Sequence, residues 1–173
     1  MSPTPSGRLL RTPQGRDLVV VRTFRAPIED VWASITESER TARWFGSWTG
    51  EPGPGRTIQM TMGFEEGTTP TDVTIEACEP PRHLALRTHS SYGSWHMEAH
   101  LAESDGVTEM RFTHHLGDAD KVGDVGPGWE YYLDMLVASR DGAPLPKWDD
   151  YYPAQKEYYL AQEAEGAGAG AAG

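Results

Sequence analysis

The spacing of apolar residues changes along the chain and predicts where helices and strands lie. Residues 17–24, DLVVVRTF, are rich in β-branched side chains and lie between a glycine and a proline, which is typical of a strand. Apolar residues then recur at helical spacing over residues 28–35. A second short helix is predicted to follow and to end near Gly46. The first part of the chain is therefore predicted to run strand, helix, helix.

The period changes to two after residue 55, which is the pattern of strands with one buried face. Short connections separate the strand-like segments, so we predict that they form an antiparallel meander. Together with residues 17–24 they would make a six-stranded sheet. The five segments are residues 57–64, 71–78, 82–88, 94–102 and 107–116.

A helical period returns near residue 125 and predicts one long amphipathic helix at about 125–140, with Gly142 just past its end. The sequence thus predicts one α+β domain of the order β-α-α-β5-α. An aromatic segment, residues 143–162, extends beyond the helix. The predicted boundaries are a flexible segment at 1–15, a single domain at 16–162 and a disordered Gly/Ala tail at 163–173.

The stretch WHMEAH, residues 95–100, places two histidines around a glutamate and raises the possibility of a metal site. In a strand these three side chains share the polar face. If the turn ESDG paired Ala102 with Val107, Glu98 would face Arg111 and His100 would face Glu109. Zinc sites need three or four ligands. We therefore interpret this face as solvated and assign no metal to it.

The same pairing points His114 inward, opposite Trp95, and His115 toward water. It also places Ala99 opposite Met110 and Met97 opposite Phe112. Two interpretations of His114 stay open. It is either a core histidine satisfied by one hydrogen bond, or a polar anchor inside a cavity.

Composition narrows the classes of partner. The formal net charge is −11, from 15 Lys and Arg against 26 Asp and Glu, so we expect no binding to nucleic acid or to anionic membranes. No stretch of about 20 apolar residues predicts a membrane span. With a single cysteine, Cys78, and an N-terminus unlike a signal peptide, we expect a cytoplasmic protein.

Several motifs in a fixed order carry a family resemblance over about residues 16–141. They are Ala26-Pro27 before Val31-Trp32, the pair Trp44-Phe45, the EPP at Glu79 to Pro81, and Gly128-Trp129. With the element order, they resemble the START/Bet v 1-like (SRPBCC) helix-grip superfamily, in the branch of the ATPase activator of the 90-kDa heat-shock chaperone. The resemblance implies a curved six-stranded antiparallel sheet wrapped around the long C-terminal helix, with an apolar cavity between them.

That cavity would be lined by the inward-facing residues of the strands and helix. The same Met and aromatic stripes also suit a filled core, and no cofactor is implied. The candidate ligand-binding residues are Trp44, Phe45, Met60, Met62, Phe64, Trp95, Met97, Phe112, His114, Trp129, Tyr132, Leu133 and Leu136.

Three functions fit this sequence. The first is non-catalytic binding of a small apolar or aromatic molecule. The second is a cavity enzyme of the cyclase, dehydratase or hydrolase type, in which His114 acts as acid or base with Tyr132 or Glu130; no catalytic set is assigned. The third is an interaction protein that contacts a chaperone. The segment 143–162 would cover the cavity mouth, form a homodimer contact or pack on the surface.

Overall fold

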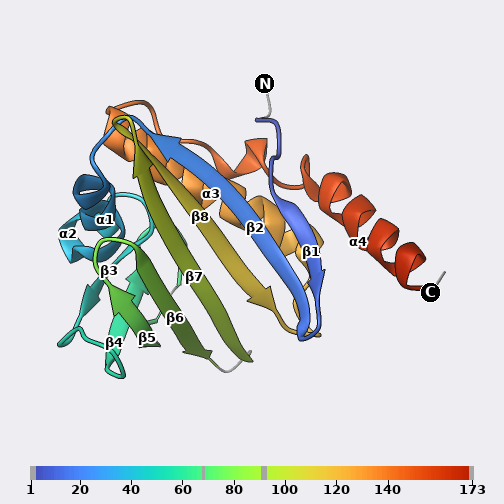
Figure 1. Ribbon diagram of the computed structural model, residues 1–173, viewed down its shortest axis with the longest axis horizontal. Helices are drawn as coiled ribbons and strands as arrows, with labels where there is room; N and C mark the ends of the chain where they lie inside the picture. The colour runs from blue at the N-terminus through green and yellow to red at the C-terminus, as the bar shows by residue number, and fades with distance from the viewer. Residues whose placement is uncertain (1–2, 68, 91–92, 172–173) are drawn as a thin grey trace.

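The computed structural model describes residues 3–67, 69–90 and 93–171 (Figure 1). Its strands form one antiparallel sheet in the order β1-β2-β8-β7-β6-β5-β4-β3. The strands are β1 (Arg8–Thr12), β2 (Gly15–Phe24), β3 (Gly46–Thr49), β4 (Thr57–Met62), β5 (Thr71–Glu79), β6 (His83–Ser90), β7 (Gly93–Ser104) and β8 (Val107–Leu116). The helices are α1 (Ile28–Thr36), α2 (Ser38–Thr41), α3 (Val122–Asp141), a 3₁₀ turn η1 (Trp148–Asp150) and α4 (Lys156–Ala171).

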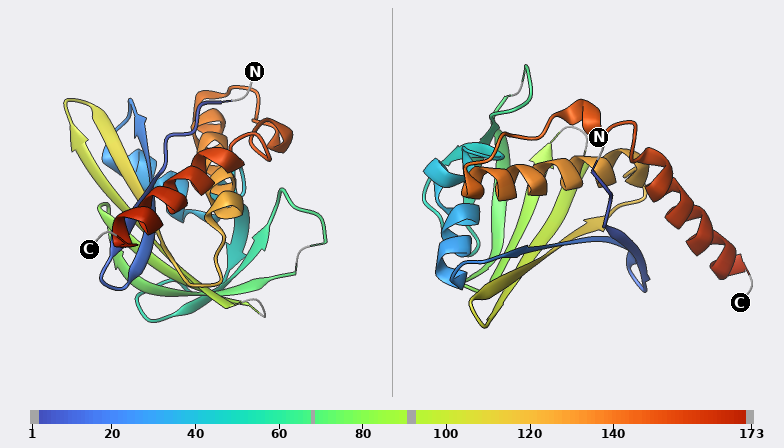
Figure 2. Two further views of the ribbon diagram at one scale, coloured as in Figure 1. Left: turned by 90° about the vertical axis from the view of Figure 1, so that its right-hand side faces the viewer. Right: turned by 90° about the horizontal axis from the view of Figure 1, so that it is seen from above.

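The sheet curves around α3, and α1 with α2 closes one end (Figure 2). The core lies between the concave face and α3, where Leu18 and Met110 of the sheet and Leu133 and Leu136 of the helix are almost fully buried. Alternating strands and an amphipathic helix bury their apolar faces against each other. The α+β class and the helix grip are therefore confirmed.

Within the described residues the sheet has eight strands rather than the six predicted. The additional strand β1 lies in the segment predicted to be flexible and pairs antiparallel with β2. Its sequence RLLRT does not alternate, so its pairing depends on contacts such as the Leu9 N–H donating to Gln162 Oε1 of α4 at 2.9 Å. The additional strand β3 begins at Gly46, where a Cβ would collide with the carbonyl oxygen of Thr61. Tertiary contacts thus create both strands.

The predicted register of β7 with β8 was wrong by two residues. Ser104 pairs with Val107, so only Asp105 and Gly106 form the turn, with φ values of 52° and 78°. Two residues with positive φ are the type I′ hairpin, whose twist matches that of the strands. A shift of two residues leaves each side chain on the same face of the sheet. The observed pairs are Glu98 with Thr113, His100 with Arg111, Ala99 with Phe112 and Met97 with His114.

The long helix is slightly longer than predicted and ends before Gly142, which has a φ of 66°. Beyond it, α4 packs against β1 and α3. The ring of Tyr159 lies so close to α3 that a Cβ on Gly126 would be 2.5 Å from it. This anchored helix continues through Ala171, into the tail predicted to be disordered. No helix in the described part of the chain is long and apolar enough to cross a membrane.

Candidate functional site

A cavity of about 510 Å³ lies between one end of the sheet and the N-terminal half of α3. Side chains from β4, the loop after it, β7, α3 and η1 form its wall. Most of the wall is aromatic or aliphatic, and its only charged side chains among the described residues are carboxylates. The lining residues are Met62, Phe64, Glu65, Trp95, Asp124, Val125, Gly128, Trp129, Tyr131, Tyr132 and Trp148.

A second cavity of about 100 Å³ lies toward α1 and α2. Trp129 lines both cavities, so its indole forms the partition between them. Phe45 stacks on Trp129 with ring centroids 5.9 Å apart, and Phe112 packs at 4.3 Å. Aromatic contacts at these distances fix the position of a ring. The Trp129 indole is therefore held in place by the rings of Phe45 and Phe112.

Most of the predicted lining residues face one of the two cavities. Met62, Phe64, Trp95, Trp129 and Tyr132 line the larger one. The two remaining inward candidates, His114 and Leu136, are fully buried in the core and line neither. The smaller cavity is lined by the candidates Trp44, Phe45, Met60, Met97, Phe112, Trp129 and Leu133.

Sequence reasoning missed part of the wall of the larger cavity. Trp148, from the aromatic extension, lies 5.5 Å from the ring of Tyr131 and stacks on Tyr152. Its 40% exposure places it at the rim. Glu65 accepts a hydrogen bond of 2.7 Å from the Tyr132 hydroxyl. The sequence showed an aromatic cluster after the long helix, but only the fold places it at the cavity mouth.

Comparison with protein families agrees with this architecture. The family model described as Activator of Hsp90 ATPase homolog 1-like protein matches residues 25–139, which is more than half of the chain. The chain belongs to this family. The resemblance to the SRPBCC helix-grip superfamily is thereby confirmed.

Solved structures share the fold of this family member. The crystal structure of CalU16 from Micromonospora echinospora has a TM-score of 0.73 and 24% identity, covering 92% of this chain and 96% of that one. A protein of Bordetella parapertussis has a TM-score of 0.71 and 23% identity, with coverages of 92% and 94%. DynU16, from the dynemicin biosynthetic locus, has a TM-score of 0.65 and 20% identity, covering 79% and 50%. A search of curated proteins found no match.

His114 lies behind the partition of this helix-grip fold. The Trp129 Nε1–H donates to His114 Nδ1 at 3.1 Å, and the Trp95 ring packs at 4.8 Å. The other ring nitrogen, Nε2, has no hydrogen-bond partner in the described structure and lies 3.9 Å from Asp120. Burial lowers the pKa of His114 to about 4. The imidazole is therefore neutral at pH 7 and sealed from solvent.

Replacing His114 by glutamine is expected to reduce the loss of stability on acidification. The unfolded histidine gains its proton near pH 6.5, but the folded one does so only near pH 4. The native state is thus fully stabilised above pH 6.5 and loses up to about 3 kcal/mol as the pH falls to 4. Urea unfolding at pH 7 and pH 5 would measure this difference. The exposed His89→Gln variant is the control, and an equal acid loss in wild type and His114→Gln would contradict the expectation.

Glu130, considered as a partner of His114, is held away from the cavity. Its carboxylate accepts the N–H groups of Ser6 and Gly7 at 2.7 Å each and pairs with Arg22 at 2.7 Å. Burial alone would raise its pKa, but hydrogen bonds from Tyr159 and Arg22 hold the pKa of Glu130 below its ordinary value. Burial and the Glu65 carboxylate raise the pKa of Tyr132. The Glu130 carboxylate therefore stabilises the fold through its hydrogen bonds and ion pair. The Tyr132 hydroxyl stays protonated.

Proposed function

We propose that this protein binds a small aromatic molecule in the larger cavity. The observation that carries the proposal is an aromatic-walled hollow of about 510 Å³. Pockets for small molecules typically have volumes of roughly 300–1,000 Å³ and mostly apolar walls with a few polar groups. The fold shared with DynU16, a protein of a biosynthetic locus, agrees with a small-molecule role.

The wall indicates what kind of molecule fits. Trp95, Trp129 and Tyr131 offer aromatic faces and edges, which favour a planar ring. The charged residues of the wall, Glu65 and Asp124, are both acidic. An anionic group would be repelled there, whereas a weakly basic one would be attracted. The ligand is therefore a neutral or weakly basic aromatic compound.

Binding without catalysis by His114 is the function that this geometry supports. His114 is fully buried and lines neither cavity, and its Nδ1 is occupied by the Trp129 indole N–H. A general base must come within hydrogen-bond reach of the proton it removes. The chaperone contact and the homodimer stay predictions, since they concern outer surfaces that the cavity does not involve.

Filling the cavity from Gly128 tests the proposal. Gly128 lines the hollow and a Cβ at this position meets nothing within 4 Å, so the side chain of Gly128→Trp starts in open space. We expect the variant to fold as the wild type does. Its affinity for neutral and weakly basic aromatic compounds that bind the wild type should fall at least about tenfold, since the indole occupies their volume. Native mass spectrometry would show whether the variant is folded, and isothermal calorimetry would measure its affinity.

The matched control is Gly128→Ala. It leaves the hollow open and should keep the affinity of the wild type, while helix propensity raises stability by about 0.5–1 kcal/mol. Unchanged affinity in Gly128→Trp would place the ligand elsewhere. A wild-type chain that binds none of a broad aromatic panel would remove the proposal.

A further inference from the structure

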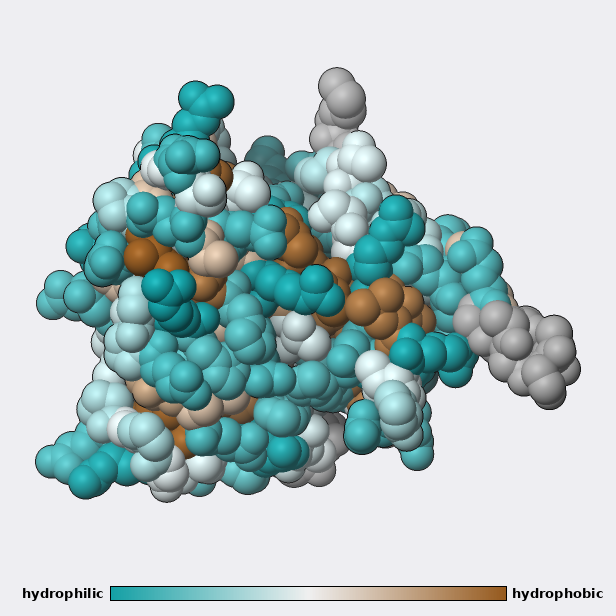
Figure 3. All heavy atoms as spheres, in the orientation of Figure 1, coloured by the Kyte–Doolittle hydropathy of each residue, from teal (hydrophilic) through white to brown (hydrophobic). Residues whose placement is uncertain are grey.

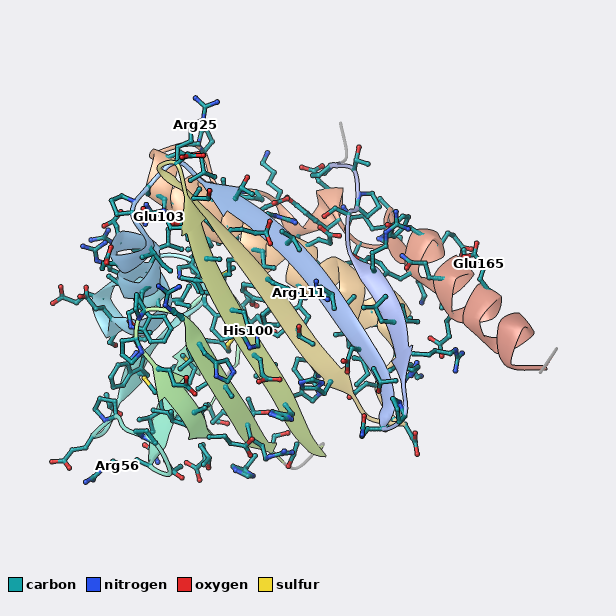
Figure 4. The ribbon with its side chains drawn as sticks, in the orientation of Figure 1. Arg25, Arg56, His100, Glu103, Arg111 and Glu165 are labelled. Atoms are coloured by element: carbon teal, nitrogen blue, oxygen red, sulfur yellow. The ribbon has the colours of Figure 1, made fainter. Side chains whose placement is uncertain are left out.

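The outer, convex face of the sheet carries an unusual concentration of histidine. The chain has 6 histidines, and His83, His96, His100 and His115 all lie on this face, on β6, β7 and β8. Figure 4 shows His100 and Arg111 on it, and Figure 3 shows that the same side of the molecule is largely hydrophilic. This face is on the opposite side of the sheet from the cavity.

Strand register makes two cross-strand histidine pairs from these four residues. His83 pairs with His100 across β6 and β7, with ring centroids 4.3 Å apart. His96 pairs with His115 across β7 and β8, with centroids 4.7 Å apart. Side chains directly opposite each other on one face start about 4.5–5.5 Å apart at Cβ. Each pair can therefore direct two imidazoles to a common point.

Glu98 lies on β7 between the two pairs and contacts both. Its Oε1 is 2.8 Å from His83 Nε2, and its Oε2 is 2.6 Å from His115 Nε2. Ligand atoms of His96, Glu98 and His115 all lie within 4.8 Å of one another, and so do those of His83, Glu98 and His100. Two imidazoles and one carboxylate are a donor set that suits zinc and related ions.

The triad of His96, Glu98 and His115 also has outer partners that orient its histidines. Asp17 Oδ1 lies 2.8 Å from His115 Nδ1, and Glu76 Oε2 lies 3.1 Å from His96 Nε2. A carboxylate on Nδ1, as Asp17 is for His115, is the usual support of a metal-binding histidine and leaves Nε2 as the ligand. In His96 the carboxylate lies on Nε2, which leaves Nδ1 as the ligand. All three members are part-buried, whereas His100 of the other triad is exposed.

Space for further ligands lies over this triad. A hollow of about 390 Å³ is bounded by the end of β1, the start of β2 and the triad itself. Three protein ligands with an open fourth position are an arrangement that zinc accepts, with water in the remaining place. The carboxylates of Asp17 and Glu76, beside the two histidines, favour a cation at this point. The Arg16 guanidinium also lines the hollow, and it pairs with Glu163 at 2.8 Å.

We propose that His96, Glu98 and His115 bind one divalent first-row transition-metal ion on the outer face of the sheet, with zinc as the reference ion. The ion replaces the proton of the hydrogen bond between His115 Nε2 and Glu98 Oε2, and these two atoms, now 2.6 Å apart, separate to receive it. His96 supplies the third ligand, and Asp17 positions His115. This site is independent of the cavity and of its ligand.

Zinc binding by the full chain, prepared without a polyhistidine tag and stripped with a chelator, tests the site. Isothermal calorimetry and elemental analysis should find one tightly bound ion per chain. His115→Ala and Glu98→Gln should weaken binding at least about tenfold, and Asp17→Ala by roughly 10–100-fold, as is usual when the orienting partner of a ligand is lost. His89→Ala should bind as the wild type does, since His89 lies on β6 outside the cluster and contacts Thr74.

Melting temperatures of the variants without metal show whether each one is folded, and Glu98→Gln keeps the shape of the side chain it replaces. A wild-type chain that takes up no zinc would overturn the proposal. Equal affinity in wild type and Glu98→Gln would show adventitious surface binding and would overturn it too. His83→Ala should keep the tight ion; a loss as large as that of His115→Ala would place the ion in the other triad.

Discussion

Replacing Glu130 by alanine is expected to lower the free energy of unfolding by about 3–5 kcal/mol, because it removes one partner of a buried ion pair. The Glu130 side chain is 1% exposed and that of Arg22 is 13% exposed. Tyr159 and the Ser6 and Gly7 N–H groups also lose their acceptor. Asp134, 2.9 Å from Arg22, stays in place and compensates only part of the buried charge.

Urea unfolding at pH 7 would measure this loss, with the exposed Glu157→Ala in α4 as the control. The control should change stability by less than about 0.5 kcal/mol. The pKa of Glu130 is lowered by folding, so its contribution is present at neutral pH and is lost as the pH falls through the lowered value. The difference in free energy of unfolding between the wild type and a Glu130→Gln variant should therefore become smaller as the pH falls. If Glu130→Ala had the same free energy of unfolding as the control, the ion pair and hydrogen bonds of Glu130 would not stabilise the protein.

The position of α3 follows from this network. Glu130 and Asp134 lie one turn apart on α3, and both bind Arg22 of β2. Tyr159 of α4 and the N-terminal segment join the same carboxylate. The opposite side of the helix carries Trp129 and Tyr132 into the cavity. The contacts of Glu130 and Asp134 thus hold α3 in place and, with it, the cavity-lining side chains on its other side.

Trp129→Ala is expected to destabilise the protein by a similar amount, about 3–5 kcal/mol, which is usual for a buried aromatic residue. Trp129 is 6% exposed and contacts Phe45 and Phe112. Its removal also takes the N–H donor from His114 Nδ1 and leaves that buried acceptor unsatisfied. Because the indole separates the two cavities, its loss should join them into one longer hollow.

Two measurements check this expectation. Urea unfolding gives the stability, and calorimetry with aromatic compounds of increasing length gives the size preference, which should move to longer compounds. Trp148→Ala is the matched control: it removes a rim indole that is 40% exposed, so stability should change by about 1 kcal/mol or less. A Trp129→Ala chain with wild-type stability and unchanged preference for length would contradict the role of the partition.

The sequence predicted much of the fold because its signals are local. The period of two fixed which side chains of β7 face inward, and the period of 3.6 fixed the inward stripe of α3. Met97 and Trp129 accordingly lie among the residues that line the two cavities. The strands β1 and β3 were missed, since RLLRT and GSWT are too short and irregular to show a period. Their partners, not their patterns, make them strands.

Register separates what the sequence determined from what it left open. Alternation assigned His96, Glu98 and His100 to the outer face, but it cannot say which residues of β6 and β8 lie beside them. The turn at Asp105 and Gly106 shifts β8 by two residues, so Glu98 contacts His115 and not Arg111. The sequence was interpreted as giving a solvated polar face without a metal. The structure instead places several histidines around the carboxylate of Glu98. Local periodicity sets the facing of each residue, whereas its neighbours depend on strand pairing, which is a contact between distant parts of the chain.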